Sequence, residues 1–362
     1  MRRPALETWA VDPPARCDGG ALPRGRHRGE RAPEPPEGRI PQGRGDATAA
    51  RPRTDGLGAP PRLTEWILSA EGTAAGHRAA LALALAAAVL HALFGALQKG
   101  RHDPWLSRGA IDASYSVMAA PFALAVVPWP EPHMWPILAG AVAIHLAYKI
   151  AQGRTYVLGA YTVVYPVVRG TGPVFTVIGA GIVFGERFAP VQWAGLALLV
   201  SGIGGLALYN LRHVSLDRDR LPAALGMAVI TGGFVALYTT YDAYGIRAAA
   251  DPFTFLAWFF FLDGVTMAPY AALRWRAMPD RPAPGPLMAR GVVGGLVAFG
   301  SFGSILLATR LDDVGEAAVL RETSVVFAAL IGWLLLGERV GPRRLALMAL
   351  IAIGAVIVEA GG

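Results

Sequence analysis

The sequence repeats itself between Arg169-Gly-Thr-Gly-Pro-Val-Phe175 and Arg321-Glu-Thr-Ser-Val-Val-Phe327, two segments that lie 152 residues apart. Further matches follow in the same register without a gap: Gly185-Glu186-Arg187 with Gly337-Glu338-Arg339, Pro190 with Pro342, and Gly202 with Gly354. Agreement at so many positions, including an arginine inside an apolar stretch, is unlikely to arise by chance. The chain is therefore predicted to consist of two related halves.

Long apolar segments surround both copies of the repeat, and each is long enough to cross a hydrocarbon layer of roughly 30 Å as a helix. The pattern predicts an all-α integral membrane protein with ten spans, near residues 79–98, 110–128, 134–152, 157–184, 191–209, 221–241, 253–273, 290–309, 314–336 and 343–359. Trp105, Trp129 and Trp135 fall at predicted ends, as interfacial aromatic residues do. The expected repeats cover residues 79–209 and 221–359.

The offset of the repeat contains five predicted helices. Because five is odd, the two halves cross the membrane in opposite directions. Inverted repeats of this kind are typical of secondary transporters, whose substrate site lies near the membrane midplane between the repeats. The pattern thus favours transport, although duplication also occurs in membrane enzymes and scaffolds.

The composition agrees with a membrane protein: 54% of the residues are hydrophobic, 16% are charged, and the mean hydropathy is +0.41. The net charge of +7 does not indicate a nucleic-acid partner, because the basic residues lie in the N-terminal segment and at the ends of apolar runs. The single cysteine, Cys17, excludes an intramolecular disulfide and a cysteine-based zinc cluster. We expect no cofactor and no metal, and the partners expected are a small-molecule solute and the lipid bilayer, with the chain a monomer or homodimer.

Residues 1–76 are rich in arginine and proline and are predicted to be disordered, apart from a short amphipathic stretch over Leu63–Leu68. Two interpretations are open: a basic extension that touches anionic lipid, or a stretch that is not translated. The expected location is the plasma membrane, the inner membrane of a bacterium. Lysine and arginine in the odd-numbered loops outnumber those in the even-numbered loops by fifteen to three, which places the odd loops in the cytoplasm. The basic N-terminal segment argues for the opposite orientation, so the orientation stays open.

The two Gly-Glu-Arg segments, each between a helix and a glycine-containing helix, resemble the EamA repeat of the drug/metabolite transporter superfamily. Other pieces carry the same resemblance: Leu90-His-Ala-Leu-Phe-Gly-Ala-Leu-Gln-Lys99, Val164-Tyr-Pro-Val-Val-Arg-Gly170, Phe261-Leu-Asp-Gly264 and Leu320-Arg-Glu-Thr-Ser324. The resemblance covers residues 79–359. It implies ten helices in two inverted five-helix halves and the transport of small metabolites, without naming the substrate.

Ionisable residues inside spans are costly and therefore mark transport pathways. Arg169 and Arg321 are the first candidates, because equivalent positions in inverted halves meet around one cavity, where a guanidinium binds a carboxylate or phosphate through two hydrogen bonds. The alternative is a buried structural ion pair. Tyr165, His145 and Tyr241 are further candidates for substrate binding. Pro166 and Pro173, on either side of Arg169, predict a broken helix at this position.

Four residues are candidates for proton coupling: Glu322, Asp263, Asp242 and His91. Burial raises the pKa of a carboxyl toward neutrality, as a proton carrier requires, but each carboxylate could instead neutralise a basic residue. Lys149 is one helical turn from His145 and could extend to the interface. The predicted function is secondary active transport, by export or proton-coupled carriage, of a small metabolite such as an amino acid or organic anion. The alternatives are a membrane scaffold or receptor, or a lipid-processing membrane enzyme; no catalytic motif is visible.

Overall fold

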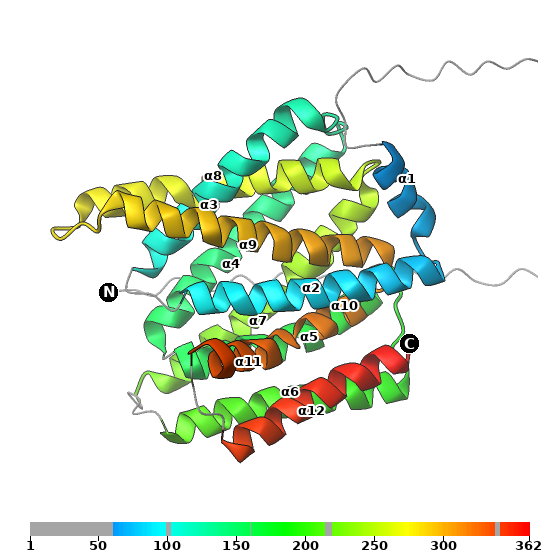
Figure 1. Cartoon of the computed structure of the whole chain (residues 1–362), viewed down its shortest axis with the longest axis vertical. Helices are drawn as coiled ribbons and strands as arrows, with labels where there is room; N and C mark the ends of the chain where they lie inside the picture. Colours follow the sequence, from blue (N-terminus) through cyan, green and yellow to red (C-terminus); the bar gives the residue numbers. More distant parts are fainter. Residues whose placement is uncertain (1–60, 99–102, 160, 214–218, 337–340) are drawn as a thin grey trace, which may run out of the picture. The chain divides into compact units, whose positions relative to one another are not determined.

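The computed structural model describes residues 61–98, 103–159, 161–213, 219–336 and 341–362, and within these ranges all regular structure is helical (Figure 1). The helices are α1 (Pro61–Ala70), α2 (Ala74–Gln98), α3 (Pro104–Pro121) with a π-helical turn η1 (Phe122–Val126), α4 (Met134–Leu158), α5 (Tyr161–Phe184), α6 (Pro190–His213), α7 (Leu221–Ala248), α8 (Pro252–Ala277), α9 (Pro284–Leu311), α10 (Val314–Arg321), α11 (Ser324–Leu336) and α12 (Pro342–Ala360).

Aspartate followed by proline starts two of the long helices. Asp103 accepts hydrogen bonds from the backbone N–H groups of Trp105 and Leu106, at 2.9 and 3.3 Å, directly before α3. Asp251 accepts one from Phe253, at 3.1 Å, before α8. An aspartate cap satisfies N–H groups that have no partner in the first turn, and proline at the first helical position has no N–H to satisfy. These starts place α3 and α8 as counterparts in the two halves.

The packing of the helices supports the predicted repeat. In the predicted repeat, α2–α6 correspond to α7–α12, and α10 and α11 together match α5. Exchanging the halves then turns the α2–α9 contact into the α7–α4 contact, and it turns the α5–α7 contact into the contact of α10 and α11 with α2. All of these contacts are present. The self-paired contacts α3–α8 and α6–α12 are among the most extensive. The counterparts α2 and α7 also run oppositely, because the start of α2 lies beside the ends of α7 and α9.

Within the described residues, eight helices are long and apolar enough to cross a membrane, and they coincide with the first eight predicted spans. Large apolar side chains on their outer faces are exposed, as lipid contact requires: Ile182 is 80% exposed and Val117 is 73% exposed. The ninth and tenth predicted spans fall on α10–α11 and α12. A total of ten spans therefore remains a prediction.

The amphipathic stretch expected over Leu63–Leu68 is helical, and helix also covers residues 61–62, 69–70 and 74–76 of the segment expected to be disordered. Residues 61–70 form α1, and α2 already begins at Ala74. In Figure 1, α1 runs across the ends of the long helices. Ile67 and Ala70 are buried, whereas Trp66 on the same helix is 44% exposed. Residues 1–60 lie outside the described residues.

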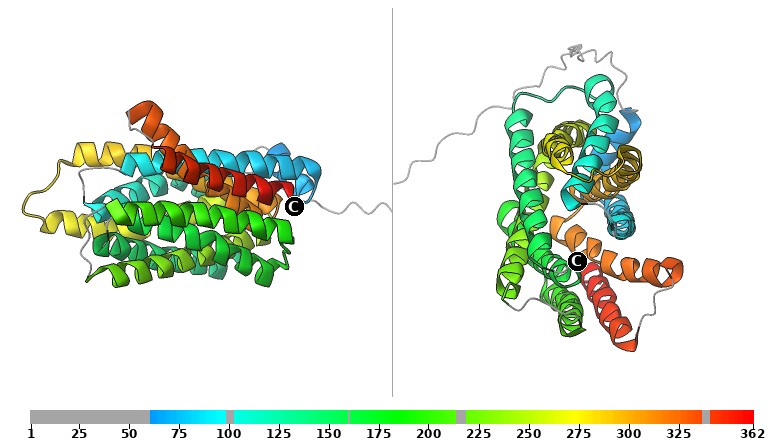
Figure 2. Two further views of the ribbon diagram at one scale, coloured as in Figure 1. Left: turned by 90° about the horizontal axis from the view of Figure 1, so that it is seen from below. Right: turned by 90° about the vertical axis from the view of Figure 1, so that its left-hand side faces the viewer.

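The ninth predicted span is interrupted at Glu322 and Thr323, where α10 ends and α11 turns away from it (Figure 2). The backbone N–H groups of Glu322 and Thr323 donate to Val319 and Leu320, three residues back, at 3.0 and 3.1 Å. The predicted break beside Pro166 and Pro173 is absent, because α5 is continuous from Tyr161 to Phe184. The half that lacks these prolines is the one that breaks.

At the end of the bundle that carries α1, polar contacts tie the two halves together. The Glu186 carboxylate, from the turn after α5, accepts hydrogen bonds from the backbone N–H groups of Val314 and Gly315, both at 2.9 Å, and so caps α10. Burial raises the pKa of Glu186, and these two N–H groups oppose the shift. Arg247 donates to the Asp312 carbonyl at 2.7 Å. These contacts hold the starts and ends of α5, α7, α9 and α10 together.

Candidate functional site

A cavity of about 1020 Å³, including its open part, lies between the two halves. Helices α2–α5 contribute to its wall from the first half and α7–α10 from the second. The lining combines aromatic rings with a few polar groups, as small-molecule sites do. The residues are His91, Phe94, Gly95, Arg108, Tyr115, His145, Tyr148, Gln152, Tyr156, Tyr165, Val168, Arg169, Val235, Tyr238, Phe259, Phe260, Asp263, Ala298, Ser301, Phe302, Ile305 and Arg321.

Arg169 on α5 is neutralised by the second half of the chain. Its Nε atom lies 2.8 Å from Oε2 of Glu322, and its Nη2 atom donates to the Ser324 hydroxyl at 2.7 Å. Nη2 also lies 3.5 Å from the carbonyl oxygen of Arg321. The Arg169 cation therefore lies at the negative end of the α10 helix dipole. It pairs with the polar groups that would otherwise have no partner at the helix break. This explains how the break is tolerated at membrane depth.

Arg321, the counterpart of Arg169, lines the same cavity and is 4% exposed. Among the described residues its guanidinium has no hydrogen-bond or ion-pair partner, and its Nε atom is buried without one. The repeat explains the difference. Arg169 uses Glu322 and Ser324, and the positions equivalent to these in the first half are Gly170 and Gly172, which carry no polar side chain. The two arginines are thus symmetric in position but not in charge environment.

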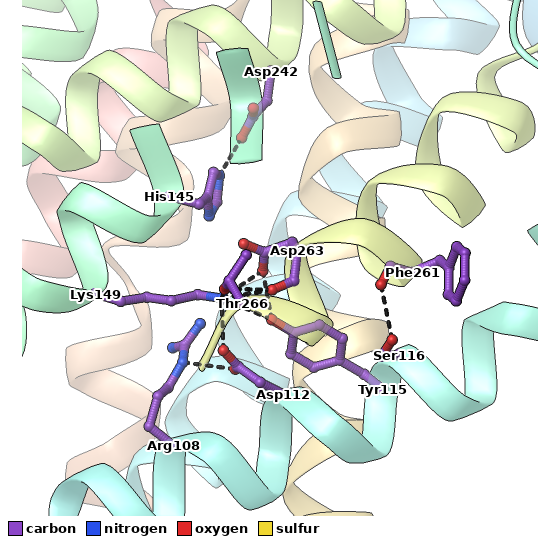
Figure 3. Close-up of polar contacts among 10 residues, drawn as sticks. All are labelled: Arg108, Asp112, Tyr115, Ser116, His145, Lys149, Asp242, Phe261, Asp263 and Thr266. Carbon is purple, nitrogen blue, oxygen red and sulfur yellow. Dashed lines mark hydrogen bonds and ion pairs between the residues drawn. The ribbon is translucent and has the colours of Figure 1, made fainter. Parts of the chain in front are cut away.

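A second polar cluster lies around Lys149, whose side chain is fully buried (Figure 3). Its Nζ atom lies 2.6 Å from Oδ2 of Asp112 and 2.9 Å from Oδ2 of Asp263. Arg108 completes the cluster, with Nε 2.8 Å from the other oxygen of Asp112. The proposal that Lys149 extends to the interface is wrong, because two buried carboxylates hold it.

Sequence reasoning missed Asp112, Arg108 and Tyr115. The predicted span began at residue 110, whereas α3 begins at Pro104, so Arg108 was assigned to a loop. The signal was present: Arg108, Asp112 and Tyr115 follow a spacing of four and three residues, which places them on one helical face. The Tyr115 hydroxyl donates to Asp263.

His145 and Asp242 form a third pair, with 2.7 Å between Nε2 and Oδ2 (Figure 3). His145 lines the cavity and packs against the rings of Tyr238 and Phe259, at centroid distances of 4.5 and 4.8 Å. Asp242 lies behind it and is fully buried. Sequence reasoning had assigned the two residues to different roles, and the structure brings them together.

The other predicted site residues divide between the cavity and its surroundings. His91 and Tyr165 line the cavity, and the Arg169 guanidinium carbon is 5.9 Å from the centre of the Tyr165 ring. Glu322 lies behind Arg169 and reaches the cavity through it. Tyr241 is not among the lining residues; its hydroxyl packs against Gly140.

One group at the α1 end of the bundle has a spacing that could hold a metal ion. Ligand atoms of His77, Asp312 and Glu316 lie within 4.8 Å of one another. His77 already contacts Asp312 through Nδ1 and lies 3.3 Å from Glu359 through Nε2, and Glu316 accepts a hydrogen bond from Gln192. The groups therefore satisfy each other, and the cavity residues do not take part.

Comparison with known proteins places the second half in a family. Residues 223–359 match the EamA-like transporter family. The solved crystal structure of another protein is 18% identical in sequence to this chain. The two superpose with a TM-score of 0.63 over 77% of this chain and 95% of the other. At this identity the likeness shows the fold alone. No curated protein matches the chain. The recognition made from the doubled Gly-Glu-Arg motif is confirmed over residues 223–359, which match the EamA-like transporter family, and the eight long apolar helices make the chain a multi-pass membrane protein.

Proposed function

We propose that the protein is a secondary active transporter that carries a small organic anion or an amino acid in the cavity between its two halves. The observation that carries this proposal is the Arg321 guanidinium, which is buried at the cavity wall and has no hydrogen-bond or ion-pair partner among the described residues. A buried charge without compensation is costly. A carboxylate or phosphate on the solute supplies the missing charge through paired hydrogen bonds.

The rest of the cavity wall supports a solute with a flat or apolar body. Tyr148, Tyr238 and Phe302 surround His145, with ring centroids 4.5–6.4 Å from one another or from the imidazole. Such rings bind an apolar body by contact and a cation by their negative faces. An anion site at Arg321 and an aromatic surface in the same cavity suit an amphoteric solute as well as an organic acid.

We infer a state that is closed at the α1 end. There Glu186 caps α10 and lies 3.8 Å from Arg247, and Arg310 lies 3.3 Å from Glu71, so these contacts join the two halves. Gly95, Gln152 and other lining residues come from the helix ends on the opposite side, so access is from the side of the odd-numbered loops. Alternating access then requires the contacts around Glu186 to open while the other side closes.

The His145–Asp242 pair is our proposed carrier of the coupling proton. Glu322 and Asp263, two other carboxylates considered for this role, each contact a basic residue, Arg169 and Lys149 respectively. A neighbouring basic group favours the ionised form of a carboxylate, which makes these two residues less suited to carry a proton. Asp242 faces histidine, the side chain that takes up and releases a proton most readily near neutral pH.

The anion site is tested by thermal unfolding of the purified protein with amino acids, organic acids, sugar phosphates and cationic drugs. We expect an anionic or amphoteric solute to raise the melting temperature with concentration. In Arg321→Gln the apparent Kd should rise roughly 10- to 100-fold, because a hydrogen bond to a charged group contributes about 1.5–3 kcal/mol. Arg187→Gln, at an exposed loop position, is the control. A solute whose stabilisation is unchanged in Arg321→Gln would contradict the proposed site.

Proton coupling is tested in proteoliposomes with His145→Gln, using the solute found in that screen. We expect accumulation driven by a pH gradient to be lost, while exchange of labelled for unlabelled solute continues, because exchange needs the binding site but no net proton movement. Both assays use the same preparation, so retained exchange also shows that the variant is folded. Accumulation at the wild-type rate in His145→Gln would exclude this pair as the carrier.

A further inference from the structure

A groove lies on the side of α3 that faces away from the Lys149 cluster. It occupies about 740 Å³, including its open part, between the first half of α3, the second half of α8 and the start of α9. Its lining is apolar and mostly small: Leu106, Gly109, Ala110, Ala113, Ala268, Ala271, Ala272, Trp275, Pro284, Leu287 and Met288. These helices are long and apolar enough to cross a membrane, so we expect the groove to open toward lipid.

The groove exists because the two helices approach closely over small side chains. A methyl group placed on Gly109 would lie 2.1 Å from the Cβ atom of Ala271, so no larger residue fits there. On either side of this contact Ala113, Ala268 and Ala272 leave space that a larger side chain would fill. A flexible apolar chain can occupy such a groove, whereas a folded protein surface cannot enter it.

Positive charge lies at the loop end of the groove. Trp275 lines the groove, and its Nε1 atom donates to the Pro282 carbonyl at 2.9 Å, which folds the α8–α9 turn over the ring. The Arg281 guanidinium lies above this ring, 5.5 Å from its centroid, and donates to the backbone carbonyl of Arg276 at 2.7 Å. The turn therefore fixes a cation directly beside the apolar groove.

Both arginines of this turn keep N–H groups for a ligand, although Arg281 already donates from Nε and Nη2 to the carbonyls of Met278 and Arg276, at 3.3 and 2.7 Å. Arg276 and Arg281 are both exposed, and within the described residues neither forms an ion pair. The neighbouring Arg274 is different, because Asp103 holds it through hydrogen bonds of 2.6 and 3.1 Å. Asp280 is the carboxylate within the turn itself, so the turn keeps a net positive charge.

We propose that this groove binds an anionic phospholipid, with one acyl chain between α3 and α8 and the phosphate on Arg281 and Arg276. Charge and shape both favour this occupant: the apolar groove at membrane depth takes the chain, and the arginines at the interface take the headgroup. The Trp275 ring lies at the boundary between these two environments, where tryptophan is common in membrane proteins.

The lipid would act on the transport site through α3. Gly109 lies at the groove, and its neighbour along the chain, Arg108, lines the central cavity and pairs with Asp112. A chain bound in the groove fills the space beside the α3–α8 contact, and this contact positions Asp112 and Asp263 on either side of Lys149. We therefore expect the lipid to stabilise the fold.

The test is thermal unfolding in detergent with added phosphatidylglycerol or phosphatidylcholine of the same chain length. For the wild type we expect phosphatidylglycerol to reach half-maximal stabilisation at a concentration that is lower than that of phosphatidylcholine by a factor of roughly ten or more. Arg276→Gln/Arg281→Gln should abolish this preference. Ala272→Phe should weaken stabilisation by both lipids, because the ring fills the groove.

Matched controls separate the groove from general charge and bulk. Arg343→Gln/Arg344→Gln removes the same charge from the exposed start of α12, and Leu273→Phe adds bulk at a position that is 64% exposed. Both should behave as the wild type. Equal stabilisation by the two lipids, an unchanged preference in Arg276→Gln/Arg281→Gln, or stabilisation by inorganic phosphate alone would overturn the proposal. A response to Ala272→Phe no larger than that to Leu273→Phe would overturn the acyl-chain site.

Discussion

Lys149→Met is expected to lower the free energy of unfolding by about 3–5 kcal/mol, one of the two largest effects in this protein. The Lys149 ammonium lies between Asp112 and Asp263, at 2.6 and 2.9 Å, and its side chain is fully buried. Methionine fills a similar volume, so the loss is electrostatic. Asp112 keeps Arg108, but Asp263 keeps only the Tyr115 hydroxyl and becomes a buried carboxylate without a cation.

The double variant Lys149→Met/Asp263→Asn distinguishes this cause from a packing defect. Once Asp263 is neutral there is no unpaired charge, and most of the lost stability should return, which a double-mutant cycle measures as coupling. The measurement is the unfolding midpoint in detergent. Arg154→Met removes an exposed basic residue from the same helix and should have little effect. A double variant as unstable as Lys149→Met would show that the charge pair is not the reason.

The apolar runs predicted the first eight helices because length and hydropathy are properties of each segment alone. The repeat predicted which helices correspond, and the contacts of α2 with α9 and of α4 with α7 agree with that correspondence. The partner of a buried charge was harder to predict. Spacing places Lys149 and His145 on one face of α4, but it does not say that Asp112 and Asp263 face the first and Asp242 the second.

The helix break shows the limit of reading local sequence. Pro166 and Pro173 predict a break in the first half, since each removes a backbone hydrogen bond. The helix nevertheless continues through both, and the second half breaks at Glu322–Thr323, where neither glycine nor proline occurs. The break depends on Arg169, which takes the Glu322 carboxylate, the Ser324 hydroxyl and a carbonyl of the last turn of α10. This contact comes from 152 residues away, and no local pattern contains it.

Arg169→Gln and Arg321→Gln are expected to differ in their effect on stability, although they are the same substitution at equivalent positions. Arg169→Gln leaves Glu322, which is 1% exposed, without its cation, and should cost about 3–5 kcal/mol. Arg321→Gln removes a buried cation that has no hydrogen-bond or ion-pair partner among the described residues. It should leave the melting temperature unchanged or raise it, as is common where a functional site is strained.

The charge on Glu322 provides the decisive comparison. Arg169→Gln/Glu322→Gln removes both members of the pair and should recover most of the stability lost in Arg169→Gln. Arg321→Gln/Glu322→Gln should instead be less stable than Arg321→Gln, because it leaves Arg169 without its carboxylate. Unfolding midpoints of the four variants and the wild type in one detergent test this pattern. If the two single arginine variants lose equal stability, then Arg321 is a structural cation like Arg169. The reason for proposing that Arg321 binds the solute would then disappear. Gly170, which stands where the other half has the Glu322 carboxylate, would no longer indicate that a bound anion takes the place of this carboxylate.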